Sequence, residues 1–326
     1  MDERSIAHYK LLEPIGRGAL GELYRARDTK VGRTVALRVI EPALFSDDTR
    51  RLALLDEARL GATLSHPNIA TLFEVAEADG VSYLAYEFAA GGSLRAEMAG
   101  RPMNPKRAAE LCIQIADALA DGHAAGILHG DLRPETIVVT GKGSAKLLDY
   151  GMWRWTRGGL VRRAAARAPE SLPDDDATIV SYMAPEQALG GETDGRADVF
   201  SLGTILHEML TGKNPFKEAS VADTLMNVVR ATPRSPSSGR DDIPAELDRI
   251  TARALSKTLE GRFQSAASLS AELRSVTAVL HVRSDDHEGD FLLPVDDEAD
   301  RTPAAVWIAG VAGVAALTGL IWWLQR

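Results

Sequence analysis

Hydrophobic residues follow two different periods along this chain, and the change from one to the other divides it. From about residue 9 to residue 88, short runs of β-branched and alternating residues stand between glycine and proline breaks, as in Thr34 to Ile40 and Tyr83 to Phe88. Within this part, Asp47 to Leu64 has helical spacing, and one side of that helix would carry Leu52, Leu55, Ala58 and Ala62. We therefore expect a small β-rich lobe with one helix over 9–88.

Residues 89–280 are expected to be mostly helical. Apolar residues recur at helical spacing from Ala108 to Ala125 and from Val199 to Leu210. Gly126 and Gly212 follow these two segments, as glycine commonly does after a helix C-terminus. Together the two parts predict an α+β fold, in which a small β-rich N-lobe precedes a larger α-helical C-lobe.

The C-terminal part of the chain consists of an acidic segment and an apolar one. Residues 281–303 are acidic, contain proline and offer few residues for a core, which is typical of a disordered linker. Ala304 to Leu324 has twenty-one residues without a charge and, as a helix, would span roughly 31 Å, about one bilayer core. Trp307 lies near one end of this segment and Trp322 near the other, as interfacial anchors do. We expect a single C-terminal transmembrane helix over 304–324, with no further domain beyond it.

Small residues within the expected span bear on self-association. They recur four positions apart, which lets two membrane helices approach closely, at Ala309 and Gly313, Ala312 and Ala316, and Ala315 and Gly319. Small residues are also frequent in membrane helices that do not pair, so both a homodimer and a monomer remain open.

Composition and charge exclude some classes of function. The formal net charge is −9, from 37 basic and 46 acidic residues, which argues against a nucleic-acid partner because phosphate neutralisation needs a basic face. Cys112 is the only cysteine, so no intrachain disulfide can form, and a reducing, cytoplasmic setting fits the globular part. No apolar stretch follows Met1, and we expect no signal peptide.

A glycine-rich turn is the first motif that can bind a ligand. Gly16, Gly18 and Gly21 have the spacing of a phosphate loop, in which glycine lets backbone N–H groups approach phosphate oxygens. The same spacing occurs in dinucleotide-binding turns, which lead into a helix. Here Glu22 to Ala26 continues as a strand, so a dinucleotide-binding turn is not expected.

A second motif lies in the helical part. The run His129 to Thr136 is followed by Asp149-Tyr150-Gly151, with Asp149 eighteen residues after Asp131. Two acidic residues on tight loops at this separation resemble the catalytic core of a protein kinase. Ser181 to Glu186 is similar to the end of a kinase activation segment, and Asp198 and Arg262 match residues that brace the catalytic loop and that segment. The resemblance covers about residues 9–280 and is to the bacterial, eukaryotic-like Ser/Thr protein kinase family.

The resemblance implies a two-lobed kinase fold that uses ATP and Mg²⁺ if nucleotide binding is retained. It assigns catalysis to Asp131 as the base, with Arg133 at the catalytic-loop lysine position. It assigns nucleotide binding to Gly16, Gly18, Gly21, Ala36, Arg38 and Glu57, and it places Glu57 where the family's phosphate-pairing residue, here Arg38, has its partner. It assigns metal binding to Asp149 and Thr136.

This chain departs from the family pattern at positions that carry chemistry. Arg38 stands in place of the phosphate-pairing lysine, and a planar guanidinium fork is not equivalent to a compact ammonium. Arg133 also replaces a lysine, Thr136 replaces a metal-binding asparagine, and Ile179 replaces a threonine that would brace Asp131. Gly130 replaces an arginine that in many kinases docks a phosphorylated activation loop.

Two functions from different classes follow. In the first, which we favour, the chain is a membrane-anchored pseudokinase that acts as a signalling scaffold or nucleotide-binding module for protein partners. In the second, it is an active Ser/Thr kinase of low rate. A nucleotide sensor without transfer lies between them. In each case we expect a single-pass protein of the cell membrane whose kinase-like lobes face the cytoplasm, because the nucleotide is cytoplasmic.

Overall fold

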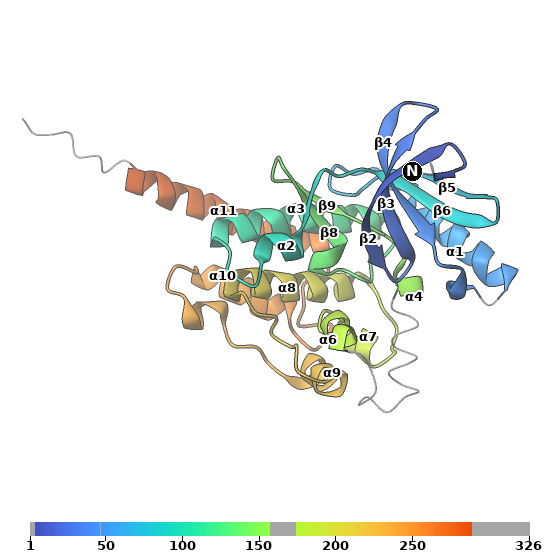
Figure 1. The fold of residues 1–326 in the computed structure, drawn as a ribbon. Helices are drawn as coiled ribbons and strands as arrows, with labels where there is room; N and C mark the ends of the chain where they lie inside the picture. Colours follow the sequence, from blue (N-terminus) through green and yellow to red (C-terminus); the bar gives the residue numbers. More distant parts are fainter. Residues whose placement is uncertain (1–3, 46, 157–173, 289–326) are drawn as a thin grey trace, which may run out of the picture. The chain divides into compact units, whose positions relative to one another are not determined.

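The computed structural model describes residues 4–45, 47–156 and 174–288. It confirms the two-lobed α+β fold, with strands gathered in the N-terminal lobe and helices in the C-terminal lobe (Figure 1). The chain divides into two units, residues 1–280 and residues 281–326. Both lobes belong to the first unit.

The N-lobe is built on one antiparallel sheet with the strand order β1-β2-β3-β4-β6-β5. Its strands are β1 (Ser5–Ile6), β2 (Tyr9–Gly18), β3 (Gly21–Asp28), β4 (Arg33–Ile40), β5 (Leu72–Ala78) and β6 (Val81–Glu87). Strand β4 is central, and alternation sends its residues to opposite faces. Val35 and Leu37 pack with Tyr9 and Tyr83 on one face. Residues at the other phase of β4, including Arg38, are therefore directed to the opposite face, where helix α1 (Asp48–Gly61) packs.

Helix α1 corrects one expectation about which side chains are buried. Asp47 caps the helix by accepting a hydrogen bond from the Arg50 backbone N–H at 2.9 Å. Leu54, Leu55 and Ala58 are buried, whereas Leu52, expected on the core side, is 50% exposed. Helical spacing identifies the helix, but the sheet that receives it decides which apolar stripe is covered.

The C-lobe core lies between α3 (Pro105–Ala124) and α8 (Gly195–Thr211), as the two apolar segments predict. Gly126 and Gly212 adopt positive φ angles of 75° and 76° after these helices. A small sheet joins β7 (Gly91–Ser93), β8 (Ile137–Thr140) and β9 (Ala145–Leu147) in that order. The other helices of the described residues are α2 (Leu94–Met98), α4 (Trp153–Thr156), α6 (Asp174–Val180), α7 (Pro185–Ala188), α9 (Val221–Arg230), α10 (Ala245–Ala254) and α11 (Ala266–Glu288), with single turns at Pro42–Leu44, Pro134–Thr136 and Pro236–Gly239.

The C-terminal expectations fall mostly outside the described residues. Helix α11 continues to Glu288, so the first residues of the expected linker are helical. The rest of that linker and the apolar segment 304–324 lie beyond the described part of the chain. Among the helices of 4–156 and 174–288, none is both long and apolar enough to cross a bilayer.

Candidate functional site

The glycine-rich turn is the tip of the β2–β3 hairpin, where Gly18 pairs with Gly21. Gly21 has a φ of 129°, and a Cβ there would collide with the backbone of Val39 and Glu41, so only glycine fits. A Cβ on Gly18 would lie 3.3 Å from the Arg38 Nη1 atom, whereas Gly16 faces open space. The hairpin therefore lies directly over the Arg38 guanidinium.

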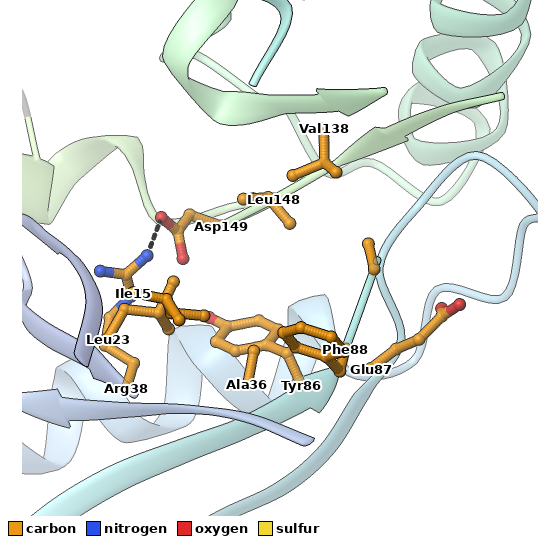
Figure 2. Close-up of a pocket in the computed structure, with 11 residues that line it drawn as sticks. Ile15, Leu23, Ala36, Arg38, Tyr86, Glu87, Phe88, Val138, Leu148 and Asp149 are labelled. Carbon is orange, nitrogen blue, oxygen red and sulfur yellow. Dashed lines mark hydrogen bonds and ion pairs between the residues drawn. The ribbon is translucent and has the colours of Figure 1, made fainter. Parts of the chain in front are cut away.

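Arg38 joins the two lobes through an ion pair with Asp149. Its Nη2 atom donates to the Asp149 Oδ2 atom at 2.7 Å, and the two side chains are only 7% and 16% exposed. Its Nη1 atom lies 3.4 Å from the Gly21 carbonyl oxygen. Figure 2 shows this pair at one end of a pocket, with Glu87 at the other end.

The pocket beside this ion pair has a volume of about 380 Å³ including its open mouth. In Figure 2, Val138 and Leu148 of the C-lobe lie across the pocket from Ala36 and Ile15 of the N-lobe. The walls are therefore aliphatic on both sides, which suits a flat aromatic group, while the charged pair closes one end. Ala36, which the resemblance assigns to nucleotide binding, is one of the lining residues. The complete lining is Ile15, Leu23, Ala36, Arg38, Tyr86, Glu87, Phe88, Ala89, Val138, Leu148 and Asp149.

Tyr86 belongs to this pocket, although the sequence analysis did not single it out. It lies opposite Ala36 in the sheet and is 6% exposed. Burial raises the pKa of the Tyr86 hydroxyl well above its ordinary value, and the nearby Asp149 carboxylate raises it further. The sequence analysis placed it only within the strand-like run Tyr83 to Phe88, and its position opposite Ala36 comes from the pairing of β4 with β6.

Three buried polar atoms at this end of the pocket lack a well-placed hydrogen-bond partner among the described residues. They are Arg38 Nε, Tyr86 Oη and Asp149 Oδ1. Buried polar atoms are nearly always paired, and exceptions commonly mark a functional site. A ligand at this end would therefore meet one N–H donor and the Tyr86 hydroxyl, which interacts with the Asp149 carboxylate.

The catalytic loop holds Asp131 close to Arg133. The Arg133 Nε atom donates to the Asp131 Oδ1 atom at 3.2 Å, and its Nη1 atom lies 3.4 Å from Glu135 Oε2. Burial by itself would lower the pKa of Arg133, but the negative charges of Asp131 and Glu135 raise it above its ordinary value. Asp131 is 4% exposed, so the candidate base is buried and partly committed to an internal cation.

The Thr136 hydroxyl is engaged with the catalytic loop itself. It accepts from the Arg133 backbone N–H at 3.2 Å and lies 3.0 and 3.2 Å from the carbonyl oxygens of Arg133 and Asp131. These contacts close the turn at Pro134–Thr136. As arranged, the hydroxyl supports the backbone of the loop.

Glu57, expected beside Arg38, has its contacts in helix α4. Its carboxylate accepts from the Trp155 indole N–H at 2.5 Å and from Arg154 Nη1 at 3.0 Å. The Trp155 ring also lies beneath the Arg50 guanidinium, which is 5.3 Å from the ring centre. The structure therefore gives Glu57 and Arg38 different partners.

Trp153, at the start of α4, packs directly on Gly130. Gly130 has a φ of 66°, and a Cβ there would overlap the Trp153 side chain. The glycine at this position thus makes room for the tryptophan. Sequence reasoning noted the glycine but not the residue that uses the space.

The bracing contacts expected from the resemblance are present. Asp198 accepts from the backbone N–H groups of His129 and Gly130 at 3.0 and 2.7 Å. Arg262 pairs with Glu186 through two contacts of 2.7 Å. Ile179, by contrast, packs against a small apolar cluster of Ala177, Val180, Met183 and Val221. The scaffold around the catalytic loop is complete, while the position of the bracing threonine has become apolar.

As arranged, the residues present do not fit a magnesium ion. One oxygen of Asp149 is bound by Arg38, and the Thr136 hydroxyl serves the catalytic-loop backbone. Within 4–45, 47–156 and 174–288, no group of three or more His, Cys, Asp or Glu side chains could hold a metal ion. Magnesium prefers an octahedral shell of oxygen atoms, and a guanidinium beside its carboxylate ligand opposes it in both space and charge.

Comparison with known proteins identifies similar chains. The family model described as the protein kinase domain matches residues 9–273. The Serine/threonine-protein kinase PknB of Mycobacterium tuberculosis is 35% identical over 272 residues, which cover 81% of this chain and 42% of that protein. The Serine/threonine-protein kinase pkn3 of Myxococcus xanthus is 32% identical over 282 residues, which cover 84% of this chain and 51% of that protein. The chain therefore spans about two fifths to one half of the length of these relatives.

Among solved structures, the kinase domain of Mycobacterium tuberculosis PknI superposes on this chain with a TM-score of 0.65. The two sequences are 25% identical, and the superposition covers 84% of this chain and 98% of that domain. The extent of the superposition indicates that the similarity includes both lobes.

Proposed function

The chain belongs to the protein kinase family, and we propose that it is a pseudokinase: a Ser/Thr-kinase-like module that binds nucleotide and protein partners but transfers phosphate slowly or not at all. The observation that carries this proposal is the ion pair between Arg38 and Asp149. It occupies the two side chains on which phosphate and metal placement would depend.

Phosphoryl transfer in this fold depends on positioning and charge. A cationic side chain holds the nucleotide phosphates, and a carboxylate holds metal against them. Here the two groups neutralise one another at 2.7 Å in a buried setting. Removing one partner from a buried ion pair typically costs about 3–5 kcal/mol, so opening this pair during catalysis would slow transfer by roughly two to four orders of magnitude.

An active kinase of low rate is the second candidate. The observation that favours it is the complete bracing of the catalytic loop by Asp198 and of the activation segment by the Glu186–Arg262 pair. Asp131 and Asp149 are both retained. A transient exchange in which Arg38 leaves Asp149 would then restore a working site.

Phosphate transfer by the full chain in detergent separates these candidates. The purified chain is incubated with ATP labelled in its γ-phosphate and a generic basic protein, alongside the Asp131→Asn variant. We expect equal, background incorporation from both proteins. An ordinary kinase rate in the wild type that Asp131→Asn abolishes would establish the active enzyme.

We also propose that the apolar segment 304–324 anchors the chain in the cell membrane with the kinase-like lobes in the cytoplasm, and that two copies pair through the same segment. The support is the uncharged length of that segment, sufficient for one bilayer core. A chain ending at Pro303 should remain in solution, whereas the full chain should sediment with membranes and require detergent for release. Full-length protein in the soluble fraction at high salt would contradict the anchor.

A further inference from the structure

We propose that the pocket beside Arg38 binds a nucleoside polyphosphate without a divalent cation, because the Arg38 guanidinium supplies the positive charge that a metal would otherwise provide. The inference rests on the proposed function, since it requires that the kinase-like lobes bind nucleotide. It adds the ligand class and the ionic requirement of that binding.

The first support is the position of Arg38 between the glycine hairpin and the acidic end of the pocket. Its Nη1 atom lies 3.3 Å from where a Gly18 Cβ would be and 3.4 Å from the Gly21 carbonyl oxygen. An anionic chain that leaves the aliphatic part of the pocket beneath the hairpin would therefore meet the guanidinium. Arginine offers a fork of N–H donors that matches phosphate oxygens in geometry and charge.

The second support is the state of Asp149. A carboxylate near nucleotide phosphates repels them unless a cation neutralises it. In this chain the neutralising cation is the guanidinium of Arg38, whose side chain is only 7% exposed. A magnesium ion coordinated by Asp149 would first have to displace this buried guanidinium. Added Mg²⁺ should therefore increase the affinity for nucleotide only slightly.

The third support is the set of unpaired atoms that face the same end of the pocket. Arg38 Nε and Tyr86 Oη can each donate a hydrogen bond, and both residues are more than nine-tenths buried. Tyr86 lies across the pocket floor from Leu148 in Figure 2, with its hydroxyl directed toward the charged end. Two donors at this end fit phosphate oxygens, while the third atom, Asp149 Oδ1, belongs to a carboxylate whose charge is already balanced by Arg38.

Titration of the full chain in detergent with a fluorescent ATP analogue, in EDTA and in excess Mg²⁺, tests the inference. We expect the two dissociation constants to agree within about threefold. Arg38→Met should weaken binding in EDTA by at least about tenfold, because it removes the only positive charge assigned to the phosphates. Arg59→Met, a change on the exposed side of α1 where Arg59 pairs with Asp56, is the matched control and should bind as wild type.

Asp149→Asn provides a variant that does not depend on losing Arg38. In a site that holds the nucleotide through a metal on Asp149, this change would weaken binding in Mg²⁺, whereas here it removes a negative charge and frees the guanidinium. We expect binding in EDTA to be unchanged or tighter, with a thermal unfolding transition as evidence that the variant folds.

The outcomes separate this inference from the proposed function. Binding at least about tenfold tighter in Mg²⁺ than in EDTA overturns the metal-free inference and leaves the absence of phosphate transfer standing. Binding in neither condition overturns the inference and leaves a scaffold without nucleotide. Phosphate transfer at an ordinary rate overturns the proposed function directly, whatever the titration shows.

Discussion

The Glu57 carboxylate on α1 accepts a hydrogen bond from the Trp155 indole nitrogen at 2.5 Å, while Arg38, its expected partner, is bound to Asp149. Helix α4, which follows the Asp149 turn, therefore contacts helix α1 of the N-lobe through Glu57. Glu57 binds the Trp155 indole, and Asp149 binds the Arg38 guanidinium. Arg154 adds an ion pair to Glu57 at 3.0 Å. This arrangement keeps Glu57 away from the pocket's charged end.

Removing the indole N–H should loosen this contact. Trp155→Phe keeps an aromatic ring against Arg50 but removes the donor to Glu57, and we expect a loss of about 1 kcal/mol in unfolding free energy. Arg154→Met should cost less, because the Arg154 side chain is 67% exposed and an exposed ion pair contributes less than about 1 kcal/mol. Hydrogen exchange of the α4 amides should quicken in the first variant. A larger loss from Arg154→Met than from Trp155→Phe would contradict this ranking.

Gly130 and Trp153 should behave as a coupled pair. Gly130→Ala forces a Cβ into the Trp153 side chain and into a positive φ, and we expect it to destabilise the fold by about 1–3 kcal/mol. In a Trp153→Ala background the overlaps with the indole ring are gone and only the contact with the Cβ of residue 153, at 2.7 Å, remains, so the cost of Gly130→Ala should fall. Urea unfolding of the four proteins in this cycle measures the difference. Equal costs in both backgrounds would show that Trp153 does not occupy this space in solution.

Restoring the three polar groups that phosphate transfer needs should create or increase activity. The triple change Arg38→Lys, Thr136→Asn and Ile179→Thr replaces the ion-paired guanidinium, supplies an amide ligand and returns a hydroxyl near Asp131. We expect autophosphorylation well above wild type, measured by labelled phosphate incorporation. Adding Asp149→Asn to the triple variant is the control and should abolish the gain. A gain that survives Asp149→Asn would show that the activity does not use this site.

Lys257 should make stability depend on pH. Its Nζ atom lies 3.9 Å from the centre of the Phe216 ring and donates to the Val228 carbonyl oxygen at 2.7 Å. Burial lowers the pKa of Lys257 to about 7, and the positive charge of Arg262 lowers it further. The unfolded chain, with an ordinary lysine pKa of about 10.4, binds this proton more tightly, so the folded state gains stability as the pH rises from about 7 toward 10.

The measurement is the unfolding free energy of wild type relative to Lys257→Met at neutral pH and at about pH 9. The unfolding free energy of wild type, relative to that of Lys257→Met, should be larger at the higher pH. Lys142→Met, a change at an exposed position, controls for the general loss of a positive charge. A wild-type advantage that shrinks as the pH rises would contradict the lowered pKa.

The sequence by itself determined the family, the two lobes and the order of the functional segments. Strand β4 and helices α3 and α8 follow from local periodicity, because a residue's neighbours along the chain decide whether an apolar stripe can form. The bracing contacts of Asp198 and Arg262 were implied by the resemblance to kinases, and both are present in the structure. The transmembrane segment remains a prediction.

Only the tertiary structure decided which charged groups meet. Arg38 and Asp149 are 111 residues apart, and no spacing in the sequence distinguishes Asp149 from Glu57 as the partner of a long guanidinium. Which carboxylate pairs with Arg38 depends on how closely α1, α4 and the Asp149 turn approach one another. Gly61 permits this approach, because a Cβ there would lie 2.8 Å from the Tyr150 carbonyl oxygen. The same packing exposes Leu52, buries Leu54 and gives Trp153 the space above Gly130. Helix orientation and side-chain partners are set by what lies within a few ångströms in space, and the linear pattern does not contain that information.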